Sequence, residues 1–301
     1  MSTLLHTVLR RYFRSKTTML ILIAAPVLGI VCGLISYEKI QREFSFDGDT
    51  FLYLMIAVMF LVTAGIVLTI SSAFSDGIIR LQCIHANSKT QIALAQIISA
   101  MLWGTVCGVL FLLPFRFFGN DFFTQHQTCK QMQVFPPLLM MFPVWGALTA
   151  VMTLTIRQKA VSSIAGIALL LGLLIGSLSL QFRLDEPKYR RDYETEYNYT
   201  DTDSEPIVAQ TEKLVPNEWY IHKPRRDYLE FAELIDPLTP VGEIGSYLVN
   251  SADDYESADQ FNKDLRSIHR ARRKFLPWFQ CFTILALTAA GTAVFRRRNL
   301  K

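Results

Sequence analysis

Residues 75–91 read SDGIIRLQCIHANSKTQ, and they separate two long uncharged runs at 51–74 and 92–115. Two membrane-spanning helices can be joined by a few polar residues, whereas this stretch is long enough for about two or three turns of helix. Its charged residues are Asp76, Arg80 and Lys89. If the runs on either side span a membrane, the stretch lies at one membrane surface and can contact another protein there.

The uncharged runs predict the fold class. The chain has 301 residues, of which 51% are hydrophobic, and the apolar residues are clustered. A helix needs about 20 apolar residues to cross about 30 Å of hydrocarbon, and six runs reach that length. The sequence therefore predicts an all-α polytopic membrane protein with transmembrane helices at 17–37, 51–74, 91–115, 135–156 and 160–182, and a sixth within 275–301 together with a basic tail.

The residues before the first run have an amphipathic pattern. Residues 3–16 read TLLHTVLRRYFRSK, in which apolar residues share one helical face and the arginines lie mostly off it. This pattern is typical of a helix that lies in the membrane interface. The alternative is a basic flank that only orients the first span.

The placement of Lys and Arg predicts the orientation, because short cytoplasmic loops are enriched in these residues. They are frequent before the first span, after the second and fourth spans, and in the tail, so we expect both termini in the cytoplasm and the protein in the plasma membrane. The same charges can contact anionic lipid, and we infer no nucleic-acid role. The short loops expected outside hold only Lys39, Arg42, Arg116 and Lys130.

Residues 183–274 form the one long polar segment, with 20 Asp and Glu against 14 Lys and Arg. We expect an extracytoplasmic insertion of mixed α/β or irregular structure. Alternation of tyrosines around Tyr193–Tyr199 favours a strand or hairpin. Short helices are predicted at 227–235 and 241–249, and a further helix at 255–268 leads to the last span, which Pro277 starts or kinks.

Three of the predicted spans contain two glycines four residues apart. Small residues at this spacing let helix backbones approach closely in lipid. We interpret all three pairs as helix-packing faces, including a possible subunit interface, rather than as ligand sites. The pairs are Gly29 and Gly33, Gly104 and Gly108, and Gly172 and Gly176.

The sequence lacks the motifs of several enzyme classes. No glycine is followed by lysine, so there is no Walker A phosphate loop. HExxH, CxxC and GxSxG are absent, and the five histidines are too scattered to predict a metal site. No ionisable residue lies near the middle of a predicted span, which argues against a proton- or ion-coupled carrier. We expect no enzymatic activity and no cofactor of the chain's own.

The topology and the opening stretch together resemble the membrane subunit of an ABC-2 type ATP-binding-cassette transporter, most closely the bacterial exporters of bacteriocins and peptides. The resemblance rests on Asp76-Gly-Ile-Ile-Arg80, on Asn87-Ser-Lys-Thr-Gln-Ile92, and on the tail Phe295-Arg-Arg-Arg-Asn-Leu300. The chain differs from such permeases at Leu81-Gln82 and at His85-Ala86-Asn87.

The resemblance implies a half-transporter without catalytic residues. A separate P-loop ATPase would bind ATP, and a second permease subunit, identical or related, would complete the path for a peptide, lipid-like or other hydrophobic substrate. Residues 76–91 would form the coupling helix, with apolar contacts from Ile79 and Ile84 and polar contacts from Arg80 and Lys89. The implied ATPase-coupling residues are Asp76, Gly77, Ile79, Arg80, Ile84, His85, Asn87 and Lys89.

Two alternatives stay open. Ile79 and Ile84 can simply anchor a short helix in the interface while Arg80 meets lipid phosphate. The whole chain can also be a membrane-anchored binding or assembly protein that acts through the acidic segment 183–274.

Overall fold

Six helices of the chain are long and apolar enough to cross a membrane, which confirms the predicted all-α polytopic class. The computed structural model describes residues 2–43, 48–84, 88–118, 131–156, 158–184, 188–198, 207–236 and 261–297. Within them, the apolar spans run over Lys16–Ile35, Phe51–Ser75, Lys89–Phe118, Phe135–Ile156, Lys159–Leu180 and Leu276–Arg297.

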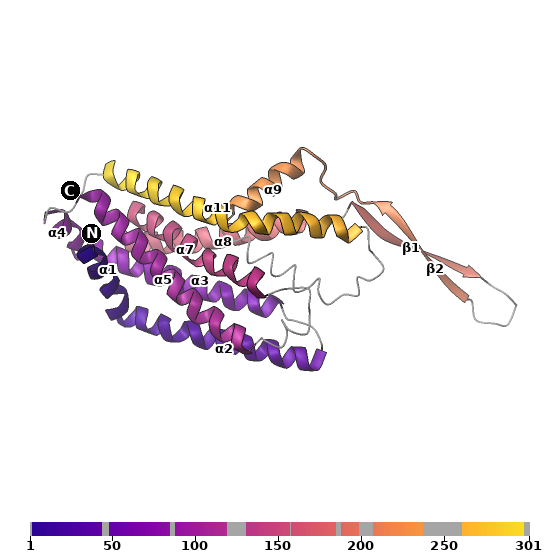
Figure 1. Cartoon of the computed structure of the whole chain (residues 1–301), viewed down its shortest axis with the longest axis horizontal. Helices are drawn as coiled ribbons and strands as arrows, with labels where there is room; N and C mark the ends of the chain where they lie inside the picture. The colour runs from indigo at the N-terminus through magenta and orange to yellow at the C-terminus, as the bar shows by residue number, and fades with distance from the viewer. Residues whose placement is uncertain are drawn as a thin grey trace. The chain divides into compact units, whose positions relative to one another are not determined.

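The helices that carry these spans extend beyond them at several ends. In chain order they are α2 (Lys16–Glu43), α3 (Gly48–Ser75), α5 (Lys89–Phe118), α7 (Gln131–Ile156), α8 (Lys159–Leu184) and α11 (Phe261–Arg297). Two short helices accompany them, α1 (Ser2–Arg14) and α4 (Ile78–Ile84). Figure 1 shows α1, α4 and the C-terminal end of α11 at the same end of the bundle.

The chain divides into two compact units, one formed by Met1–Ser177 with Leu234–Lys301 and one formed by Leu178–Glu233. The first holds most of the spanning helices. The second begins with the last turns of α8 and continues through β1 (Tyr189–Asn198), β2 (Ile207–Pro216) and most of α9 (Arg225–Ile235).

Within the first unit, α5 contacts α1, α2, α3, α4, α7 and α11. Glycines allow its close approach to two neighbours. A Cβ on Gly104 would lie 2.7 Å from the Phe142 carbonyl oxygen of α7, and one on Gly146 would lie 2.6 Å from the Ala100 oxygen. On α2, a Cβ on Gly29 would collide with the Phe111 oxygen of α5.

The other predicted glycine positions differ in environment. A Cβ on Gly33 would lie 2.7 Å from Cβ of Phe118, and one on Gly108 would collide with the Phe142 ring. Gly172 and Gly176 on α8 have no heavy atom within 4 Å of such a Cβ. In the part of the chain that the structure describes, this third pair therefore meets no neighbour within the chain, and the packing face expected there, including a subunit interface, stays a prediction.

Large side chains fill the space between the helices that the glycines bring together. Trp103 of α5 and Trp145 of α7 are fully buried. The Trp145 Nε1–H donates to Thr63 Oγ1 of α3 at 2.8 Å, and that hydroxyl donates in turn to the Met59 carbonyl at 2.8 Å. The Trp145 indole is thus both packed and hydrogen-bonded, as the indole of a buried tryptophan usually is.

The last helix, α11, packs against α7 and α5. A Cβ on Gly291 would lie 3.2 Å from Ile97 of α5 and close to Val151 of α7. Nearer its other end, the Gln280 side-chain amide donates to the Pro137 carbonyl at 3.0 Å. The helix is continuous from Phe261 to Arg297, so Pro277 lies inside it, one residue after the apolar span begins at Leu276.

The second unit contains an antiparallel hairpin in which Tyr189 pairs with Pro216 and Asn198 with Ile207. The structure thus has a strand where tyrosine alternation predicts one. The helix predicted at 227–235 corresponds to α9, whereas the one predicted at 241–249 and the start of the one predicted at 255–268 lie outside the described residues.

Candidate functional site

The site is the turn between α3 and α5, which contains α4. The α3 helix ends at Ser75, and Asp76 N–H donates to the Ser72 carbonyl at 2.9 Å. Gly77 follows with a φ of +70° and donates to the Phe74 carbonyl at 3.1 Å. A glycine in this left-handed conformation is a common way to end a helix, because it avoids a Cβ clash.

The α4 helix begins immediately after this turn. Leu81 N–H donates to the Gly77 carbonyl at 3.0 Å, which is the first hydrogen bond of the new helix. The left-handed glycine therefore fixes the direction in which α4 leaves α3. Among the described residues, no heavy atom lies within 4 Å of a Cβ placed on Gly77, so within this part of the chain the need for glycine is conformational.

The α4 helix has an inner and an outer face. Ile79 is 1% exposed and Gln82 is also buried, and α4 contacts α3 and α5. On the outer face, Leu81 is 53% and Ile84 is 75% exposed, and Arg80 is also exposed. Two apolar side chains and one cation thus point away from the bundle.

This geometry changes the residues expected to make apolar contact. The resemblance assigns that role to Ile79 and Ile84, but the buried Ile79 packs into the core. Leu81, at a position where the sequence differs from the permease pattern that it resembles, is exposed in its place. The rotation of α4 about its own axis causes the exchange, since residues 79 and 81 lie on different sides of a helix.

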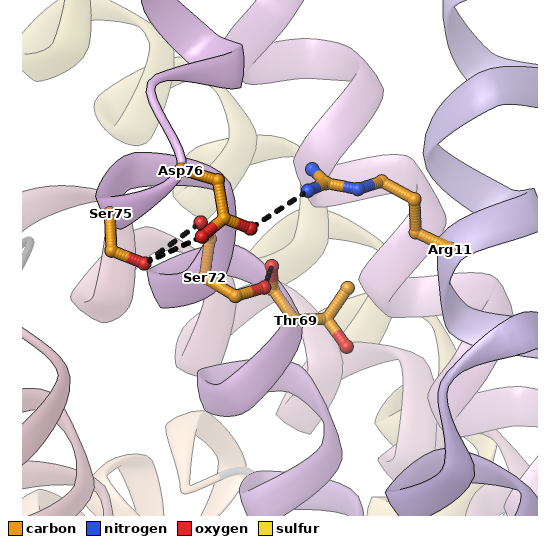
Figure 2. Close-up of polar contacts among 5 residues, drawn as sticks. All are labelled: Arg11, Thr69, Ser72, Ser75 and Asp76. Carbon is orange, nitrogen blue, oxygen red and sulfur yellow. Dashed lines mark hydrogen bonds and ion pairs between the residues drawn. The ribbon is translucent and has the colours of Figure 1, made fainter.

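The α1 helix is joined to this turn by charge. Arg11 Nη2 lies 3.8 Å from Asp76 Oδ2, with 22% and 58% of the two side chains exposed, as Figure 2 shows. Burial lowers the pKa of Arg11, and the nearby Asp76 carboxylate opposes that shift. Ser75 Oγ also lies 3.3 Å from Asp76 Oδ1, so the carboxylate is held by two groups (Figure 2).

Aromatic packing fixes the other side of α1. Leu4, Val8 and Tyr12 lie one turn apart and are buried. The Tyr12 ring stacks on Trp103 of α5 with centroids 5.6 Å apart, and Phe13 meets the same indole edge-on at 6.0 Å. Burial raises the pKa of Tyr12 above its ordinary value. The apolar face predicted for the membrane interface is therefore partly covered by α5.

The far side of the turn is held by a capping box. Ser88 Oγ accepts from Gln91 N–H, and Gln91 Oε1 accepts from Ser88 N–H, both at 3.2 Å. This reciprocal pair satisfies two of the N–H groups left free at the start of α5. Lys89, one of the predicted coupling residues, is the first residue of that helix and is half-buried.

The structure thus gathers six of the eight predicted coupling residues around one turn, while His85 and Asn87 lie outside the described residues. Sequence reasoning missed three participants. Ser88 and Gln91 carry the Ser-x-x-Gln signature of a capping box, which was readable. The pairing of Arg11 with Asp76 had no local signal, because it depends on how α1 folds back on α5.

The side chains exposed on the outer face of α4 in this turn are apolar or cationic. In the parts of the chain that the structure describes, no three His, Cys, Asp or Glu side chains are grouped so that they could hold a metal ion. Burial raises the pKa of the Cys83 thiol, which keeps it protonated and weakly nucleophilic. The outer surface of α4 is apolar and cationic, and the helix itself contacts α3 and α5.

No known family model matches the chain, and no curated protein matches it either.

Proposed function

We propose that the chain is the membrane subunit of an ABC-2 type transporter, which exports a peptide, lipid-like or other hydrophobic substrate and docks a separate P-loop ATPase. One observation carries the proposal. The α4 helix lies between two spanning helices, buries Ile79 and exposes Leu81 and Ile84 beside Arg80. A surface with an apolar centre and a charged edge suits a protein partner better than it suits water.

The connections of α4 explain how docking can act on the spans. Ile79 and Gln82 pack inward, and α4 contacts both α3 and α5. The tight turn at Gly77 leaves little chain to absorb movement between α3 and α4. A displacement of α4 by a closing ATPase dimer is therefore passed to α3 and α5, and the Arg11–Asp76 pair couples α1 to the same movement.

The proposal also places the protein in the cell. The end of the bundle that carries α1, α4 and the C-terminal end of α11 is the cytoplasmic end. The membrane is a bacterial plasma membrane. Two permease subunits and two ATPases form the working complex. ATP is bound by the ATPase, since this sequence has no Walker A loop.

Affinity purification from native membranes tests the docking surface. We expect a P-loop ATPase to be recovered with the wild-type chain and to be lost with Ile84→Glu, because a carboxylate at the centre of an apolar contact must be desolvated. Gln158→Glu is the matched control, since it adds the same charge at an exposed position in another connection on the same predicted side. Failure to recover any ATPase with wild-type protein, or equal recovery with Ile84→Glu, would refute the assignment.

A second candidate is favoured by the separate compactness of Leu178–Glu233. On this alternative the chain is a membrane-anchored binding or assembly protein that acts through residues 183–274. Deleting residues 195–256 discriminates between the two functions. If the deletion variant loses ligand binding and no ATPase is recovered with it, the anchored binding protein is favoured. If an ATPase is still recovered with the deletion variant, the permease is favoured.

A further inference from the structure

The start of α9 is tied to the end of α8 by one arginine. Arg226 is 9% exposed, and its Nη2 donates to the Leu184 carbonyl at 3.0 Å. Its Nε lies 3.2 Å from Glu230 Oε1, and its guanidinium carbon lies 5.0 Å from the centroid of the Tyr220 ring. Carbonyls at a helix C-terminus lack intrahelical partners and attract cations, so this is a favourable position for a buried guanidinium.

This contact sets the level of α9 relative to the membrane. The apolar span of α8 ends at Leu180, and Leu184 is the last residue of the same helix. One further turn rises about 5 Å, which is less than the depth of a headgroup layer. The Arg226 guanidinium therefore lies about one helical turn beyond the apolar span of α8, and the first turn of α9 is within the reach of one arginine side chain from that level.

The burial pattern of α9 is the reverse of that expected in water. A helix on a soluble protein turns its apolar face inward and its charges outward. Among the α9 side chains that the structure describes, the buried ones are Arg226 and Glu233, whereas Tyr228 is 71% and Phe231 is 54% exposed. Positions 228 and 231 lie on one face of the helix. Trp219, in the segment that leads into α9, is 76% exposed.

We propose that α9 and the segment before it lie on the membrane surface, with Trp219, Tyr228 and Phe231 inserted among the lipid headgroups. Aromatic side chains favour this layer because their rings are apolar and the Trp N–H and Tyr O–H remain hydrated. Arg225, exposed in the first turn of α9, is placed to meet lipid phosphate. The occupant of this surface is lipid, and the inference does not depend on the proposed transport function.

Tryptophan quenching in vesicles tests the proposal on the full chain. The protein is reconstituted in phosphatidylcholine vesicles, with or without bromine on the upper acyl chain, and the emission of Trp219→Phe is subtracted from that of the wild type. We expect the difference signal to lose most of its intensity in the brominated vesicles. Trp278→Phe gives the positive control, because Trp278 is 75% exposed within the first turns of the last span.

Absence of bromolipid quenching at Trp219 overturns the proposal, and aqueous iodide then identifies the cause. Quenching by iodide means that the surface faces water. Protection from iodide means that protein covers it, either a second copy or a partner. A second experiment uses the double variant Tyr228→Ser/Phe231→Ser, which should abolish the bromolipid quenching of Trp219. The control Asp227→Asn, on the same helix, should retain that quenching. Equal quenching in the double variant and the control contradicts insertion of the two rings.

Discussion

Arg11 and Asp76 form an ion pair of 3.8 Å between the N-terminal helix and the turn that follows the second span. The two residues are far apart in sequence, yet the pair joins the helix that precedes the bundle to the turn that leads into α4. Because Asp76 is more than half exposed, the pair is a small source of stability.

The first prediction concerns the size of this link. Arg11→Gln and Asp76→Asn should each lower the free energy of unfolding only slightly, with a coupling energy of about 0.5 kcal/mol in a double-mutant cycle. Added salt should reduce the coupling, because exposed charges are screened. Denaturant titration in detergent micelles measures it, and a coupling above about 2 kcal/mol would show that the pair is buried in solution.

A second prediction uses two glycines of contrasting environment. Gly104→Ala should destabilise the chain by about 1–3 kcal/mol, because the new Cβ would lie 2.7 Å from the Phe142 carbonyl oxygen and force α5 away from α7. Gly172→Ala is the matched control, with no neighbour within 4 Å, and should be neutral or slightly stabilising. Thermal unfolding of the two variants in the same detergent makes the comparison. Equal losses would contradict the open surroundings of Gly172.

A third prediction separates conformation from packing at Gly77. Its φ is +70° and its surroundings are empty, so Gly77→Ala should cost about 1–2 kcal/mol through backbone strain alone. Gly77→Asn should recover part of the loss, because asparagine tolerates the left-handed region. If the proposed docking function holds, Gly77→Ala should also weaken recovery of the ATPase, since α4 would leave α3 in a different direction. Indistinguishable stability of the alanine and asparagine variants would argue against strain as the cause.

Tyr12 provides a fourth prediction. Its hydroxyl is buried without a hydrogen-bond partner among the described residues, while its ring stacks on Trp103. Tyr12→Phe keeps the ring and removes the unsatisfied hydroxyl, so it should stabilise the chain by about 1 kcal/mol. Tyr12→Ala removes the ring as well and should destabilise by about 3–5 kcal/mol. The free energy of unfolding at neutral pH measures both changes, and a loss of stability in Tyr12→Phe would mean that the hydroxyl is hydrogen-bonded.

The same residue predicts a pH dependence. Burial raises the pKa of Tyr12 in the folded chain, whereas an unfolded tyrosine ionises at about 10. The free energy of unfolding is therefore unaffected by ionisation of Tyr12 below about pH 10, and it falls as the pH rises further, because only the unfolded chain then loses the proton. Wild type should lose about 1 kcal/mol more than Tyr12→Phe between about pH 10 and 11. Parallel alkaline unfolding curves for the two proteins would contradict burial of the phenol.

The spans were predictable from sequence because length and the absence of charge are enough to cross a bilayer. The helix of α1 was readable from its apolar spacing, but the sequence placed its apolar face in lipid, and Trp103 covers part of it. The sequence did not allow us to predict which side of α4 faces the bundle. A helix of seven residues is too short for a periodic signal, and the turn at Gly77 decides which side Ile79 and Leu81 take.

Glycine spacing was equally incomplete as a guide. Gly104 and Gly172 stand in the same sequence pattern, but only the first meets a neighbour in the described part of the chain. The difference arises from the position of each helix in the bundle. The α5 helix has other helices around it, whereas the face of α8 that carries Gly172 and Gly176 has no described neighbour within 4 Å. No pattern within a single span carries that information.

The packing of α11 has a consequence for biosynthesis. The α5 and α7 surfaces that Gly291 and Gln280 contact are made long before α11 leaves the ribosome. Until then this seam faces lipid, and the Pro137 carbonyl lacks its side-chain donor. The bundle is therefore completed only after the long polar segment has been synthesised, so the time needed to make that segment sets how long the surfaces of α5 and α7 wait for α11.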